Sequence, residues 1–212
     1  MILIGHYDSP FVRRVAIALA LYDMAFEHRA WSVFADADKI APFNPLRRVP
    51  TLILDDGEAL IESAAILDAL DEMAGADKAL CPRAGVERRR VLNICALASG
   101  LADKAVSLVY ERVLHERATA AWVDRCLGQM EAVLDALEAD RWAAAGPWWF
   151  GENLTHGDIM VACAMRFVRE AHEGLFDLTA WPALAAHWER CEAMPVFQGA
   201  VKPFFVALPA KG

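Results

Sequence analysis

The sequence predicts two domains: an N-terminal α/β domain with a mixed sheet, followed by an all-helical domain. Short apolar runs of strand length alternate with short helical segments in residues 1–78, whereas helical periodicity dominates from residue 86 onward. Between them, Leu80–Gly85 contains a proline and a glycine, which interrupt regular structure. We therefore predict domains at residues 1–78 and 86–212.

The first elements of the N-terminal domain are a strand, a helix and a second strand. Residues 2–6 are an apolar run of strand length, and Pro10 then opens a helix, because the N–H that proline lacks would have no partner there. Apolar residues at 12, 15, 16, 19 and 20 share one helical face. Residues 26–31 form the second strand. A crossover helix between two strands implies that the strands are parallel.

A hairpin and a helix complete this domain. Residues 51–54 and 58–61 flank Asp55-Asp56-Gly57, which is a strong signal for a tight hairpin. A helix begins near Ser63, and the polar stretch at 36–39 is expected to hold a short helix. The order is β-α-β-α-β-β-α, which predicts a mixed sheet with helices on its faces.

The second domain is predicted to be helical throughout. Its periodic segments are residues 86–115, 119–140, 155–172, 182–193 and 195–202. Thr155-His156-Gly157-Asp158 has the pattern of a capping box, with an aspartate in place of the usual glutamate.

Composition and motif content argue against several classes of function. The longest run without a charge is 12 residues, 91–102, whereas a membrane-spanning helix requires about 20. No signal peptide, CxxC pair, HExxH or glycine-rich phosphate loop is evident. With a net charge of −8 and five scattered cysteines, we expect a cytoplasmic protein with reduced thiols, no metal, no membrane association and no nucleic-acid partner.

Four segments carry a family resemblance. These are Ser9-Pro10-Phe11-Val12-Arg13-Arg14, Asn44-Pro45-Leu46-Arg47-Arg48-Val49-Pro50-Thr51, Ile61-Glu62-Ser63-Ala64-Ala65-Ile66, and residues 155–159. In this order and spacing they resemble the cytosolic glutathione S-transferases, of a bacterial type with a serine in the active site, over essentially the whole chain. The resemblance implies a thioredoxin-like N-terminal domain, glutathione as co-substrate and a homodimer.

The resemblance places a cis peptide bond at Val49-Pro50. An X–Pro bond has only a modest preference for trans, about 0.5–1 kcal/mol, so a fold can select cis. The turn is then expected to expose the Val49 backbone N–H and C=O, which pair with the extended tripeptide like an added strand. The alternative is an ordinary trans proline in a loop.

Three side chains are expected at the ends of the tripeptide. Ser63, at a helix N-terminus, binds the γ-glutamyl carboxylate, and Glu62 pairs with the ammonium group. Arg48 meets the glycine carboxylate, because a guanidinium pairs with a carboxylate through two parallel bonds. Ser63 could instead serve only as a helix N-cap. Arg47 could equally be a solvated surface charge.

Ser9 is the predicted catalytic residue. A free thiol has a pKa of about 8.5, and a hydroxyl donor at a helix N-terminus stabilises the thiolate. Its alternative role is to cap the first helix. No cysteine occurs before residue 81, which disfavours disulfide chemistry on the enzyme. Tyr7 is the reserve candidate, and Arg14 matches a family arginine that is structural, forming an ion pair within the first domain.

The second substrate is expected to be a small apolar electrophile bound between the domains. Phe11, Tyr110 and Leu114 are the predicted walls, although each could be ordinary core. The predicted function is glutathione transfer. Two alternatives stay open: a non-catalytic ligand-binding or regulatory protein of the same fold, and a glutathione-dependent isomerase or dehalogenase.

Overall fold

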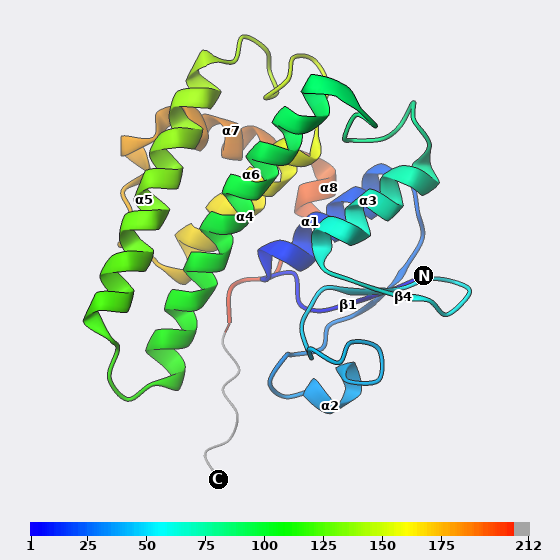
Figure 1. Ribbon diagram of the computed structural model, residues 1–212, viewed down its shortest axis with the longest axis horizontal. Coiled ribbons are helices and arrows are strands. Elements are labelled where there is room, and N and C mark those ends of the chain that lie inside the picture. Colours follow the sequence, from blue (N-terminus) through cyan, green and yellow to red (C-terminus); the bar gives the residue numbers. More distant parts are fainter. Residues whose placement is uncertain (206–212) are drawn as a thin grey trace. The chain divides into compact units, whose positions relative to one another are not determined.

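The computed structural model describes residues 1–205, which form two compact units. The first unit contains Met1–Arg83 and the segment from Pro195, and the second contains Ala84–Met194. Each unit is described separately below (Figure 1).

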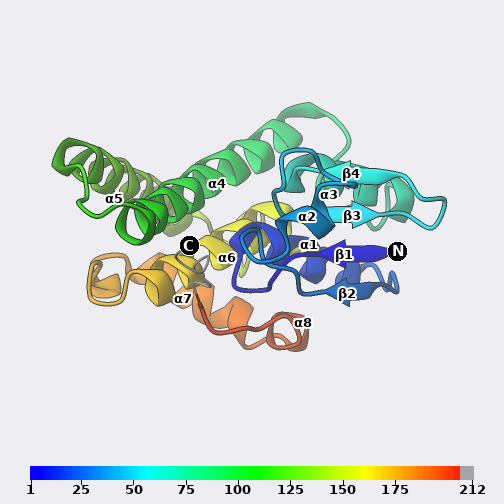
Figure 2. The same cartoon turned by 90° about the horizontal axis from the view of Figure 1, so that it is seen from below.

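The first unit is built on a four-stranded mixed sheet. The strands are β1 (Ile2–Ile4), β2 (Glu27–Arg29), β3 (Thr51–Ile53) and β4 (Ala59–Ile61). Figure 2 shows them side by side in the order β2-β1-β3-β4. Strand β1 is parallel to β2 and antiparallel to β3, and β3 is antiparallel to β4. The predicted mixed sheet, with a parallel first pair and an antiparallel hairpin, is therefore confirmed.

Four helices accompany this sheet: α1 (Pro10–Leu21), α2 (Ala37–Ile40), α3 (Ser63–Ala74) and α8 (Pro195–Gln198). Alternating strand residues point to opposite faces. On one face Ile4 and Ile53 pack with Ile40 of α2, while Leu3 and Leu52, paired across β1 and β3, are fully buried on the other. Helices α1 and α3 pack against each other.

Buried Arg13 connects α1 to the C-terminal segment. Its Nε donates to the Ala200 carbonyl at 2.8 Å and its Nη2 donates to the Phe197 carbonyl at 3.0 Å. The predicted helix at 195–202 is wrong beyond Gln198: Gly199, a poor helix former, follows, and Pro203 lacks a backbone N–H to continue the helix. Instead, these carbonyls accept from the guanidinium.

The second unit is helical, as predicted. It comprises α4 (Gly85–Leu114), α5 (Ala120–Ala143), α6 (His156–Ala171), the short 3₁₀ helix Leu178–Ala180 and α7 (Pro182–Glu192). Helix α4 packs against both α5 and α6. The capping box at the start of α6 is confirmed: the Thr155 N–H donates to Asp158 Oδ2 at 2.8 Å, and both residues are buried.

By length and composition alone, helix α4 is long and apolar enough to span a bilayer. Core helices of soluble proteins meet the same criterion, and α4 packs against two neighbours.

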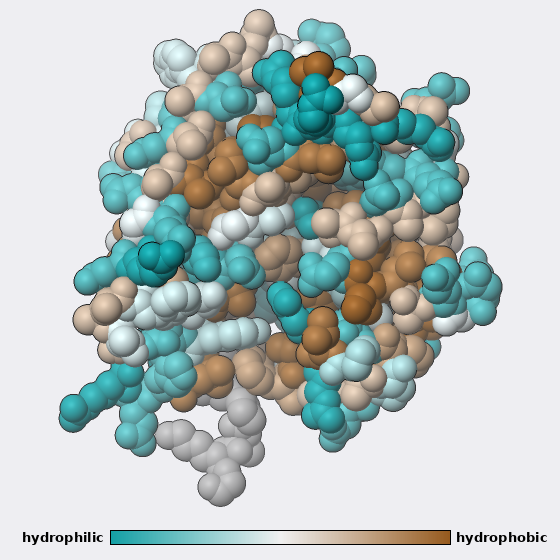
Figure 3. All heavy atoms as spheres, viewed as in Figure 1, coloured by the Kyte–Doolittle hydropathy of each residue, from teal (hydrophilic) through white to brown (hydrophobic). Residues whose placement is uncertain are grey.

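Hydrophobic and hydrophilic residues are interspersed over the face shown in Figure 3, as is usual for a folded surface.

Candidate active site

The loop from β1 to α1 carries Ser9 at the start of a helix. Ser9 has extended backbone angles, φ −70° and ψ 123°, and its Oγ accepts from the Val12 N–H at 3.4 Å. The predicted capping role is therefore confirmed. This bond uses a lone pair of the oxygen, so the same hydroxyl keeps its hydrogen to donate to a second group. Capping and thiol activation are compatible in one side chain.

The Val49–Pro50 peptide bond is cis, as predicted. No hydrogen bond to the Val49 N–H or C=O is present among residues 1–205, which leaves both groups available to an extended peptide. The turn abuts Gly5 at the start of the Ser9 loop: a Cβ built on Gly5 would lie 2.8 Å from Val49 Cβ. The structure thus brings the cis turn and the Ser9 loop together.

The start of α3 differs from the simple cap that the sequence allows as an alternative. The N-cap is Glu62, with a positive φ of 66°, and Ser63 is the first helical residue. Such a backbone conformation costs about 1–3 kcal/mol for a residue other than glycine. Ser63 is buried, and its Oγ accepts from Arg14 Nη2 at 2.6 Å. Arg14 therefore places a positive charge next to the Ser63 hydroxyl.

Arg48 and Glu62 lie close together. Their closest atoms, Arg48 Nη1 and Glu62 Oε1, are 3.7 Å apart. The Arg48 side chain is 59% exposed and the Glu62 side chain is 60% exposed. Exposed pairs of this kind contribute at most about 1 kcal/mol, so a charged ligand can replace the contact at small cost. Arg47, with φ 50°, is 3.4 Å from Asp38 in another exposed pair, as expected for a surface charge.

Tyr7 stacks on His28 of β2. The ring centroids are 3.9 Å apart and the planes differ by 2°. Burial raises the pKa of the Tyr7 phenol above its ordinary value of 10.0, so this hydroxyl stays protonated at neutral pH. His28 was not recognisable in the sequence, because a histidine in an edge strand has no spacing signal that points to the loop after β1.

The predicted electrophile residues belong to different units. Phe11 is half-buried in the first turn of α1. Tyr110 and Leu114 lie one turn apart near the end of α4, with exposed fractions of 38% and 46%. These two are therefore not ordinary core of the second unit, and their role toward a substrate stays a prediction.

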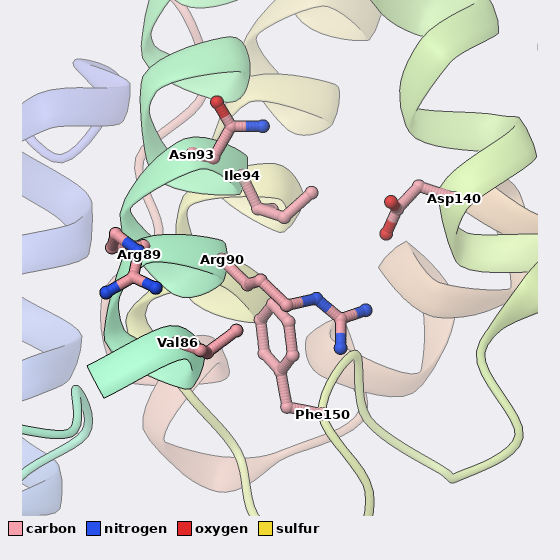
Figure 4. A pocket seen from close by; sticks show the side chains of 7 residues that line it. All are labelled: Val86, Arg89, Arg90, Asn93, Ile94, Asp140 and Phe150. Carbon is pink, nitrogen blue, oxygen red and sulfur yellow. The ribbon is translucent and has the colours of Figure 1, made fainter.

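A separate pocket of about 320 Å³ lies within the second unit (Figure 4). Arg90 extends over the ring of Phe150, with its guanidinium carbon 5.4 Å from the ring centroid. Asp140 accepts from Trp149 Nε1 at 2.6 Å. The pocket is lined by Val86, Arg89, Arg90, Asn93, Ile94, Asp140 and Phe150. None of the predicted electrophile residues lines it.

Within residues 1–205, no group of three or more histidine, cysteine, aspartate or glutamate side chains could hold a metal ion. Four of the five cysteines are buried, and all five are free thiols.

The C-terminal segment adds contacts to the Ser9 loop that the sequence did not reveal. The Lys202 ammonium contacts His6 Nδ1, and the Phe205 N–H donates to Asp8 Oδ2 at 3.4 Å. These contacts join residues almost two hundred positions apart, so only the fold brings them together.

Comparisons with known proteins agree with this geometry. The model of the glutathione S-transferase N-terminal domain matches residues 3–78, and the model of the glutathione S-transferase C-terminal domain matches residues 120–190. The uncharacterised GST-like protein YibF of Escherichia coli K12 is 30% identical over 79% of this chain and 82% of its own length. Maleylacetoacetate isomerase of Pseudomonas aeruginosa is 27% identical over 94% of this chain and 95% of its own length.

A solved structure shows the same similarity. The glutathione S-transferase of Methylobacterium radiotolerans, crystallised in complex with glutathione sulfonate, aligns with a TM-score of 0.90 at 27% identity. The alignment covers 100% of this chain and 98% of that protein.

Proposed function

The chain belongs to the glutathione S-transferase family and is a glutathione transferase with glutathione as its co-substrate, and we propose that it activates the glutathione thiol as a thiolate for addition to a small apolar electrophile. The observation that carries this proposal is the meeting of the cis Val49–Pro50 turn and the Ser9 loop at Gly5.

Ser9 supplies the stabilisation of the thiolate. Its hydroxyl donates to the sulfur while its oxygen still accepts from the Val12 N–H, and the N-terminus of α1 adds the positive end of the helix dipole. Lowering the thiol pKa by about 2 units corresponds to about 2.7 kcal/mol. A hydrogen bond to a charged group contributes about 1.5–3 kcal/mol. Ser9 therefore acts as a neutral donor and is never deprotonated.

The backbone of Val49 fixes the cysteine of the tripeptide, and the polar side chains fix its two ends. Ser63, backed by Arg14, receives the γ-glutamyl carboxylate, and Glu62 pairs with the ammonium group. Arg48 exchanges its exposed contact with Glu62 for the glycine carboxylate. Arg48 and Glu62 each gain a ligand group of opposite charge, which replaces a contact of low strength.

The thiolate then attacks the electrophile, for which Phe11, at the start of α1, is the wall that we propose in the first unit; Tyr110 and Leu114 are the residues that we propose in the second unit. Holding both reactants together supplies proximity, and the fixed donor stabilises the charge. We further propose a cytoplasmic homodimer, in accord with the family. Sedimentation equilibrium tests this proposal. A dimer has twice the chain mass of 23.4 kDa, and a mass equal to that of one chain at micromolar concentration contradicts the dimer.

Calorimetric titration with reduced glutathione tests the binding step. We expect saturable heat of association at millimolar ligand or below, and similar affinity for S-methylglutathione, because most contacts are to the tripeptide backbone and ends. Absence of heat with both ligands contradicts the proposal.

A second candidate is glutathione-dependent isomerisation, which is favoured by the similarity to maleylacetoacetate isomerases over more than nine-tenths of the chain. The same activated thiolate adds to the substrate and is then released. An isomerase therefore regenerates glutathione, whereas a transferase consumes it. Measuring free thiol during turnover of maleylacetoacetate and of an aryl halide separates the two functions.

A further inference from the structure

The imidazole of His28 connects β2 to the loop that carries Ser9. His28 is the middle residue of β2, and its Nε2 lies 2.7 Å from the carbonyl oxygen of Gly5. A carbonyl can only accept, so Nε2 is the donor. The ring also stacks on Tyr7, two residues before Ser9.

Both backbone polar groups of Gly5 are hydrogen-bonded to residues of β2. Its N–H donates to the Arg29 carbonyl at 2.9 Å, and its C=O accepts from His28. On its remaining side there is no space: a Cβ would lie 2.5 Å from Val12 Cγ2 and 2.8 Å from Val49 Cβ. Gly5 therefore touches the first turn of α1 and the cis turn together, so its position determines where these two parts lie relative to each other.

We propose that His28 is a positioning residue for the transfer reaction. Through Gly5, it sets the distance between the Ser9 hydroxyl and the backbone groups of Val49. This inference rests on the proposed function, in which the Ser9 hydroxyl and the Val49 backbone groups both bind the cysteine residue of glutathione. His28 acts through Gly5 by its hydrogen bond and through Tyr7 by its ring, and not on the sulfur itself.

Three substitutions separate the two contacts. His28→Phe retains a ring to stack on Tyr7 but loses the donor to Gly5, His28→Gln retains a donor but loses the ring, and His28→Ala loses both. For His28→Ala we expect turnover of an aryl halide to fall about tenfold or more, equivalent to about 1.4 kcal/mol in the barrier. The pKa of the bound thiol rises, and glutathione affinity changes less than about threefold, since the tripeptide ends are untouched.

Glu27→Gln is the matched control on the same strand. The Glu27 side chain is 59% exposed and pairs with Arg29, so this variant is expected to keep the wild-type thiol pKa and turnover. Partial recovery of the thiol pKa in His28→Phe or His28→Gln, relative to His28→Ala, identifies which contact matters more. Unfolding midpoints in urea verify that all variants are folded.

Amide hydrogen exchange in the ligand-free protein decides the inference independently of glutathione. We expect exchange at residues 6–9 to accelerate about tenfold or more in His28→Ala and to stay at the wild-type rate in Glu27→Gln. Unchanged exchange overturns the inference, as does an unchanged thiol pKa with unchanged turnover. If wild-type protein binds no glutathione, the proposed function fails, and the exchange result alone decides whether His28 positions the loop.

Discussion

At the scale of single residues, the candidate site depends on two serine hydroxyls that each accept one hydrogen bond and still have a hydrogen to donate. The Ser9 oxygen accepts a long bond from Val12 and keeps its hydrogen. Ser63 accepts from Arg14 and can still donate to a carboxylate. Ser9 and Ser63 were recognisable in the sequence, because both lie at predicted helix starts. Arg14 was expected to be structural, but its contact with Ser63 depends on the packing of α1 against α3.

Ser9→Cys tests whether position 9 faces the sulfur. We expect the variant to gain glutathione-dependent reduction of a small disulfide, because a thiolate at a helix N-terminus attacks a disulfide and forms a mixed disulfide. Glutathione then attacks that mixed disulfide and restores the thiol. The assay measures oxidised glutathione formed per enzyme. No gain over wild type means that this side chain does not point to the substrate thiol.

At the scale of elements, the site is assembled by short strands and the turns that follow them. The sequence predicted all four strands, and Asp55-Asp56-Gly57 marked the turn of the hairpin. It did not predict the packing at Gly5, because a single glycine after a strand gives no information about its neighbours. Three dimensions are needed to see that α1, β2 and the cis turn all contact this residue.

Gly5→Ala is expected to destabilise the first unit. The new methyl group would lie 2.5 Å from Val12 Cγ2, at a backbone φ of 128° that disfavours side chains. Overpacking and backbone strain together predict a loss of about 2–4 kcal/mol. Gly57→Ala is the matched control, because Gly57 also has a positive φ of 92° but has nothing within 4 Å of its Cβ position.

Urea unfolding of the two variants measures the difference. The control is expected to lose about 1 kcal/mol from backbone strain alone. Equal losses in the two variants contradict the tight contact at Gly5.

Buried His172 predicts that the second unit loses stability in mild acid. Its Nε2 donates to the Ala105 carbonyl at 2.9 Å and its Nδ1 accepts from Arg112 Nη2 at 2.9 Å. Burial lowers its pKa below 6.5, and the bond to Ala105 opposes this in part. The unfolded chain therefore binds a proton near pH 6.5 that the folded chain does not. Stability is full above that pH and falls as pH decreases toward the folded pKa.

The slope is at most about 1.4 kcal/mol per pH unit for each such histidine. His187, whose pKa burial also lowers, adds a second contribution in the same range. Free energies of unfolding at pH 7.5 and 5.5 are compared for wild type and His172→Gln, which keeps a donor and an acceptor. We expect a smaller pH slope in the variant; equal slopes contradict the assignment.

At the scale of the whole molecule, the sequence predicted the fold class, the mixed sheet, the cis bond and the helical second unit. These follow from periodicity, turn residues and a resemblance that extends over the chain. The segment from Pro195 was predicted as a longer helix of the second domain, yet it packs on the first unit through Arg13. An arginine in a helix carries no sequence signal for distant backbone carbonyls, so this contact is visible only in the structure.

The central claim is that the Ser9 hydroxyl makes the thiol of bound glutathione anionic. The direct measurement is the ultraviolet absorbance of the thiolate, titrated against pH with glutathione bound to wild type and to Ser9→Ala. We predict a bound-thiol pKa about 2 units below the free value of about 8.5 in wild type, and a rise of about 1 unit or more in the variant, with glutathione affinity nearly unchanged. Identical thiol pKa values in the two proteins would contradict the account.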